Sequence, residues 1–277
     1  LDLLKHENNL HVKAMIEKMN QLLKEANATF ALNFEEIKNR YTKGLVRERH
    51  IAKALRIKLF EHYTESDERI NLLTTLYAGK EQNAGLENHA ALENEIRSNL
   101  LKAGGKAFVP ENQKAFISVE KIKNNILSGG GIPCYPLLLD DKNGQITEFE
   151  ENKHTLLNEL ARNQIGAIEF IPGRNSKEKL LEYATFFREH NFIVLFGTEH
   201  NTPELQPLTV SCRNNVPLDD ELLSINYESA CAVAAHQYLR SKGQAGFIDP
   251  GGNPAFSRLN ELINLGKAVI HYFITSH

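Results

Sequence analysis

Three short apolar segments, each preceded by a helix-like segment, organise the second half of the chain. The apolar segments are residues 132–136, 166–171 and 192–196, and each ends at a proline or a glycine. The helix-like segments are residues 118–127, 156–162 and 177–189. Strands that are joined through helices over short connections run parallel, and nearly all-apolar strands are typical of sheets covered on both faces. The pattern predicts parallel βα units, in a barrel or in a doubly wound sheet.

The first part of the chain has a helical pattern instead. Apolar residues recur at helical spacing from Val12 to Leu23, and Asn33 is placed as a helix N-cap. Gly104 and Gly105 end this region, and the last part of the chain predicts helices over 228–242 and 259–274. We therefore predict an α/β portion over 1–205, with a helical insertion over about 1–104, and a C-terminal helical extension over 206–277.

Composition and charge restrict the functional classes. The formal net charge of −3 argues against a general electrostatic grip on nucleic acid, although a local basic groove still allows a nucleic-acid substrate. No apolar run approaches the roughly 20 residues that span a bilayer. Cys134, Cys212 and Cys231 are far apart, which predicts three buried thiols in a reducing, cytoplasmic compartment. The chain begins at Leu1 and not at Met, so we expect either a fragment of a longer protein or a chain whose beginning was removed.

Polar residues follow the ends of the three predicted strands. Tyr135 closes the first strand, Arg174 follows the second, and Glu199 and His200 follow the third. Because the carboxyl ends of parallel strands meet at one edge, we expect these side chains to converge. Glu and His suit a divalent zinc, manganese or iron ion, and the planar fork of Arg suits a phosphate. Ordinary loop hydrogen bonds are the alternative. Glu169, inside an apolar strand, requires a polar interior or a cationic partner.

Five segments, in this order along the chain, resemble the PHP family of metal-dependent phosphoesterases. They are 47–55 (Arg-Glu-Arg-His-Ile-Ala-Lys-Ala-Leu), 105–110, 122–136, 166–170 (Gly-Ala-Ile-Glu-Phe) and 197–201 (Gly-Thr-Glu-His-Asn). The resemblance covers roughly residues 10 to 203. It implies a PHP-type distorted parallel (β/α) barrel, incomplete at its N-terminus, with metals held at the carboxyl rim by His and carboxylate side chains.

The resemblance also implies hydrolysis of a phosphoester in a small molecule or a nucleotide. It assigns Arg174 and His50 to catalysis, Glu199 and His200 to a divalent metal, and Tyr135 and Asn201 to the substrate. Tyr135 stands where the family has a ligand His, and Asn201 stands where it has a second one.

Three functions stay open from the sequence. The first is a phosphoesterase, and the second is a PHP-like barrel that binds a ligand or a protein without hydrolysis. The third is a metal-dependent hydrolase that acts on a different bond. The family's opening His-x-His strand is absent before residue 10, which is the main departure from its pattern.

Overall fold

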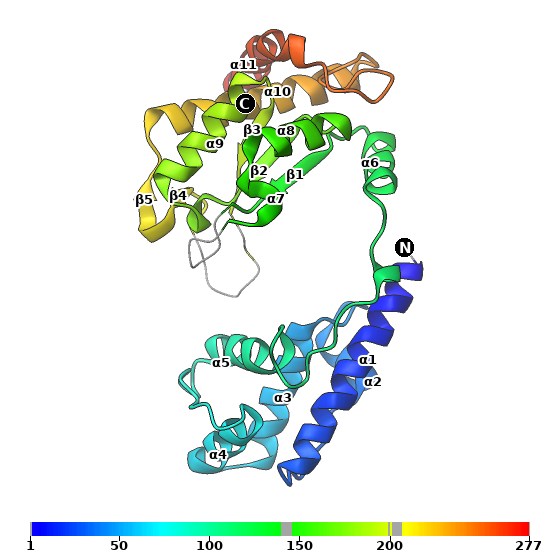
Figure 1. Ribbon diagram of the computed structural model, residues 1–277, viewed down its shortest axis with the longest axis vertical. Coiled ribbons are helices and arrows are strands. Elements are labelled where there is room, and N and C mark those ends of the chain that lie inside the picture. The colour runs from blue at the N-terminus through cyan, green and yellow to red at the C-terminus, as the bar shows by residue number, and fades with distance from the viewer. Residues whose placement is uncertain (1, 140–145, 199, 201–206, 277) are drawn as a thin grey trace. The chain divides into compact units, whose positions relative to one another are not determined.

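The chain forms two compact units, Leu1–Ile117 and Ser118–His277 (Figure 1). The computed structural model describes residues 2–139, 146–198, 200 and 207–276. The boundary between the units differs from the predicted one after residue 205, because the last helices pack on the sheet of the second unit, as shown below. Each unit is described by itself.

The described residues of the first unit are helical and contain no strand. The helices are α1 (Asp2–Glu25), α2 (Phe34–Tyr41), α3 (Glu48–His62), α4 (Ser66–Leu76) and α5 (His89–Ile96). A π-helical turn, Arg97–Leu101, follows α5, and a 3₁₀ turn covers Gln113–Ala115. The predicted helical character of this region is therefore confirmed.

The core of the first unit uses the apolar faces that the sequence predicted. Met15, Met19 and Leu23 of α1 are buried, as is Leu55 of α3. Asn33 caps α2, since its Oδ1 accepts a hydrogen bond from the Glu36 amide at 2.9 Å. Burial of these apolar side chains stabilises the unit by about 1.5–3 kcal/mol for each fully buried residue.

The second unit alternates helices and strands before its two long closing helices. Its first elements are α6 (Val119–Ser128), β1 (Cys134–Leu137), α7 (Glu148–Glu151), α8 (Lys153–Arg162), β2 (Ala167–Phe170), a 3₁₀ turn (Pro172–Arg174), α9 (Lys177–Glu189) and β3 (Ile193–Phe196). Then follow β4 (Ser211–Cys212), a 3₁₀ turn (Arg213–Asn215), β5 (Val216–Pro217), α10 (Asp220–Ser241), a 3₁₀ turn (Phe256–Arg258) and α11 (Leu259–Thr275). The predicted N-caps Ser118 and Ser176 accept from the amides of Lys121 and Lys179.

The three main strands form one parallel sheet in the order β1-β2-β3. Tyr135 lies opposite Ile168, and Ile168 lies opposite Val194. The predicted parallel pairing is confirmed for these strands, whose connections each contain a helix. The barrel itself stays a prediction, because three strands are fewer than a barrel requires.

Helices cover both faces of this sheet. Phe170 and Val194 pack in one cluster with Leu156 of α8 and Leu180 of α9. On the other face, Ala167 and Ile193 pack with the small residues Cys231, Ala232 and Ala235 of α10 and with Leu262 of α11. Small side chains let α10 approach the sheet closely. The segment predicted as an outer extension, 206–277, therefore contributes to the core.

Helix α10 also covers the outer edge of β3. The amide of Val194 donates to Oγ of Ser229 at 2.9 Å, and the amide of Phe196 donates to Oδ1 of Asn226 at 2.9 Å. Amides at the edge of a sheet otherwise need water or another strand as a partner. Two side chains of a helix thus take the place of a neighbouring strand.

Two residues of the sheet differ from the sequence prediction. Cys134, predicted to be buried, is exposed. Glu169 is exposed as well, so its carboxylate needs neither a polar interior nor a cationic partner. Gly197 lies beneath it, since a Cβ at that position would lie 2.5 Å from Oε1 of Glu169.

Candidate functional site

The carboxyl edge of the sheet in the second unit carries two of the described site candidates, Arg174 and His200. Because β1, β2 and β3 run parallel, the segments that leave them begin at the same edge. Leu138 and Leu139 leave β1, Arg174 closes the turn after β2, and Thr198 and His200 follow β3.

The sequence predicted Tyr135 at the end of the first strand, but β1 continues to Leu137. The Tyr135 side chain directs its hydroxyl group to a buried carboxylate. The hydroxyl donates to Oε1 of Glu150 across 3.2 Å, and the ring of Phe149 lies beside it with centroids 6.1 Å apart. Burial, with the negative charge of Glu150 as the second cause, raises the pKa of Tyr135 to about 12. Tyr135 therefore stays protonated at neutral pH and is a hydrogen-bond donor rather than an anionic metal ligand.

Glu150 fixes the turn after β1, and sequence reasoning missed it. Its side chain is 2% exposed. Oε1 accepts from the amide of Leu138 at 3.2 Å, and Oε2 accepts from the amide of Leu139 at 2.8 Å. Leu139 has a φ of 54°, a left-handed conformation that costs free energy for a leucine. The charge-assisted bonds offset this cost. No local pattern distinguishes Glu150 from its neighbours Glu148 and Glu151.

Asn175 holds the same turn from the other side. Its side chain is fully buried, and Nδ2 donates to the carbonyl of Leu138 at 2.9 Å. Leu138 thus connects the surroundings of Tyr135 with those of Arg174.

Arg213 orders the main chain next to Arg174. Its amide donates to the carbonyl of Asn175 at 2.9 Å, and its guanidinium group donates to the carbonyl of Arg174. Arg213 comes from the short turn between β4 and β5, so two basic residues meet at the end of β2. The sequence contained no signal that pairs them, because they are far apart along the chain.

His200 is exposed, and its Nδ1 lies 3.1 Å from the hydroxyl oxygen of Thr198. Glu199 and Asn201, which the sequence predicted as metal and substrate ligands, lie outside the described residues. The predicted pairing of Glu199 with His200 therefore stays a prediction.

His50 belongs to the first unit, where it caps a helix. Its Nδ1 accepts a hydrogen bond from the amide of Arg47 at 2.9 Å, at the start of α3. Burial, followed by the positive charges of Arg49, Lys53 and Arg47, lowers the pKa of His50 below its ordinary value. A neutral imidazole that accepts an amide hydrogen bond has a local structural role, while its predicted catalytic role stays a prediction.

The described residues do not by themselves fit a divalent metal. Within residues 2–139, 146–198, 200 and 207–276, no three His, Cys, Asp or Glu side chains gather as metal ligands would. Glu150 already accepts three hydrogen bonds, and Tyr135 keeps its proton. What the edge does contain is an arginine with an ordered main chain, a tyrosine hydroxyl and an imidazole, which suit an anionic oxygen-rich ligand.

Comparison of the chain with family models, with curated proteins and with solved structures finds no match. No helix in the described part of the chain is both long and apolar enough to cross a bilayer.

Proposed function

We propose that the second unit belongs to a PHP-like phosphoesterase and that the carboxyl edge of β1–β3 binds the phosphate group of its substrate. The observation that carries this proposal is the position of Arg174. It closes the turn after β2, and contacts from Arg213 hold the carbonyl groups of Arg174 and Asn175. A guanidinium group on an ordered main chain loses less entropy when it binds a phosphate through two parallel hydrogen bonds.

The proposed substrate is a phosphorylated small molecule or a nucleotide. In this proposal Arg174 holds phosphate oxygens, and His200 lies at the neighbouring strand end. The family resemblance adds a divalent metal, zinc, manganese or iron, with Glu199 and His200 among its ligands, and a distorted barrel as the fold. The described residues alone do not complete such a metal site, so no reaction step is assigned to the metal. A cytoplasmic location is part of the proposal and agrees with three cysteines that form no disulfide.

A second candidate function is binding without hydrolysis, and the hydrogen bond from Tyr135 to Glu150 favours it. At the position where the resembling family has a ligand His, this chain has a phenol whose pKa is raised to about 12 and whose proton is engaged. Such a group stabilises the turn after β1 and takes no metal. The edge would then bind a phosphorylated ligand as a recognition module.

One set of measurements on the purified protein distinguishes the two candidate functions. Elemental analysis gives the metal content, hydrolysis of p-nitrophenyl phosphate with added Mn²⁺ gives turnover, and calorimetry with phenyl phosphate gives binding. Bound metal with turnover supports the phosphoesterase, and binding without metal or turnover supports the recognition module. Neither binding nor turnover contradicts both.

The variant Arg174→Gln tests the residue that carries the proposal. Loss of a charge-assisted bidentate contact should weaken phenyl phosphate binding by about 10-fold or more. Arg162→Gln is the matched control, since the Arg162 side chain is 75% exposed on α8. Equal affinities of the two variants for phenyl phosphate would show that Arg174 does not bind the phosphate group.

A further inference from the structure

The first unit contains a cavity of about 310 Å³ between the start of α1, the residues that precede α3 and the 3₁₀ turn Gln113–Ala115. Its walls include Leu4, Glu7 and Asn8 of α1, together with Arg47 and Glu111. This volume lies at the lower end of the range of small-molecule sites, which is roughly 300–1,000 Å³. A ligand the size of one amino acid fits it. All of its walls belong to one unit.

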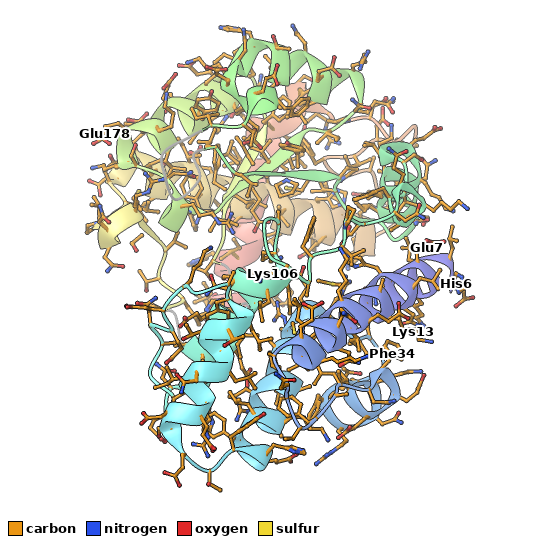
Figure 2. The ribbon with its side chains drawn as sticks, turned by 60° about the horizontal axis from the view of Figure 1, so that its bottom comes forward. His6, Glu7, Lys13, Phe34, Lys106 and Glu178 are labelled. Carbon is orange, nitrogen blue, oxygen red and sulfur yellow. The ribbon has the colours of Figure 1, made fainter. Side chains whose placement is uncertain are left out.

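Glu7 is the feature that sets this cavity apart. The residue is 8% exposed, and it lines the cavity from the second turn of α1 (Figure 2). Among the described residues, no donor forms a hydrogen bond or an ion pair with its carboxylate, and neither carboxylate oxygen is among the fully buried atoms that lack a partner. The oxygens are therefore accessible where Glu7 lines the cavity, and a ligand there can donate hydrogen bonds to them.

The polar neighbours of Glu7 are already engaged. Nδ2 of Asn8 donates to the carbonyl of Val46 at 3.0 Å, and Nε2 of His11 lies 2.8 Å from the carbonyl of Val109. Because a carbonyl only accepts, Nε2 of His11 carries a proton. These bonds hold the wall around Glu7 without satisfying its carboxylate, so the cavity is ordered before any ligand binds.

The rim of the cavity carries the opposite charge. Lys5 and Arg47 line it and are exposed. A ligand that pairs with both kinds of charge needs a cationic group that contacts Glu7 and an anionic group that contacts the basic residues of the rim. An α-amino acid in its zwitterionic form has these two groups on one carbon atom and has the size of the cavity.

We propose that this cavity is a binding site for a free α-amino acid, with its ammonium group on Glu7 and its carboxylate on Arg47. The site is independent of the phosphoester proposal for the second unit. Glu111, also on the wall, gives a basic side chain a further partner. Arginine is therefore the first probe.

Calorimetry of the whole chain with L-arginine, and a screen of the other natural amino acids by ligand-observed NMR, test the proposal. Binding of L-arginine should weaken by about 10-fold or more in Glu7→Gln, because a charge-assisted hydrogen bond is lost. Glu17→Gln removes the same charge from an exposed position of the same helix and should leave affinity unchanged. No binding by any amino acid at about 10 mM, far above the range of specific sites, would overturn the proposal.

Two further readouts separate binding from a structural role. Agmatine lacks the carboxylate of arginine, so Arg47→Gln should weaken arginine binding and leave agmatine binding unchanged. In the absence of ligand, Glu7→Gln should unfold at the same temperature as the unchanged protein, since the carboxylate has no described partner to lose. A lower unfolding temperature with unaltered arginine affinity would show that Glu7 is structural and would reject the site.

Discussion

The hydroxyl group of Tyr135 donates to Oε1 of Glu150, and the same carboxylate accepts from the amides of Leu138 and Leu139. One buried side chain thus fixes both a phenol and the main chain at the exit of β1. All three partners are donors, so the site requires an acceptor at each carboxylate oxygen.

Glu150→Gln should destabilise the protein by about 2 kcal/mol. The amide nitrogen of glutamine would face a donor at one of the two oxygen positions, which leaves a buried donor unsatisfied. Urea unfolding followed by circular dichroism measures the change. Glu148→Gln, at an exposed position of the same short helix, is the control and should alter the free energy of unfolding little. A similarly small effect of Glu150→Gln would mean that the turn does not depend on this carboxylate.

Tyr135 should ionise well above the ordinary tyrosine range. Its pKa is raised to about 12 by burial and by Glu150, so the phenolate absorbance of this residue should appear only near that pH. Because the unfolded chain ionises near pH 10, the contribution to stability is complete below that value and is lost as pH rises towards 12. The difference between ultraviolet titrations of the unchanged protein and Tyr135→Phe isolates the group. Titration of the difference spectrum near pH 10 would contradict the burial.

His236 should make the second unit sensitive to mild acid. Its Nδ1 accepts from the amide of Phe247 at 3.1 Å, and its Nε2 lies 3.0 Å from the carbonyl of Gly130. Burial, with Arg240 as a further cause, lowers its pKa below the ordinary value of 6.5. The unfolded state therefore binds more protons at acidic pH, and stability falls as pH decreases below about 6.5.

His236→Gln removes this proton uptake and should flatten the pH dependence of the unfolding temperature between about pH 6.5 and 5. His271→Gln, at an exposed position of α11, should leave the dependence as it is. Identical pH profiles for the unchanged protein and His236→Gln would show that the imidazole does not carry the effect.

Gly266→Ala should destabilise the packing of α10 against α11. A Cβ at this position would lie 1.8 Å from the main-chain oxygen of Cys231, and two backbones must separate to accept it. We expect a loss of about 3 kcal/mol in the free energy of unfolding. Gly129→Ala is the control, since its added Cβ meets the nearest atom at 3.5 Å. Equal melting temperatures for the two variants would contradict the close crossing.

Local signals in the sequence predicted the regular elements well. Asn33, Ser118 and Ser176 cap helices as expected, because an N-cap depends on a side chain and an amide two or three residues away. The parallel pairing of β1, β2 and β3 followed from their alternation with helices. Such features depend on residues that are close together in the sequence, so they can be predicted from it.

Features that depend on distant contacts were beyond the sequence. The helices of 206–277 were predicted as an outer extension, yet Cys231 and Ala235 pack on the sheet. Whether a helix packs on a sheet depends on contacts between residues that are distant in the sequence. Glu150 resembles any surface glutamate until the turn after β1 surrounds it. The family resemblance assigned His50 to catalysis, whereas its described hydrogen bond, from the amide of Arg47, caps a helix. The positions of Arg174 and His200 after strand ends followed from the sequence, while Tyr135 lies inside β1 and none of the hydrogen bonds was predicted.

The contact between α10 and the outer edge of β3 also bears on self-association. A strand from another copy of the chain that docked beside β3 would compete with Ser229 and Asn226 for the same two amides. At the other margin, Pro136 of β1 has no amide hydrogen, and the amide of Leu138 directly after β1 already donates to Glu150. A docking strand therefore loses main-chain donors at both margins of the β1-β2-β3 sheet.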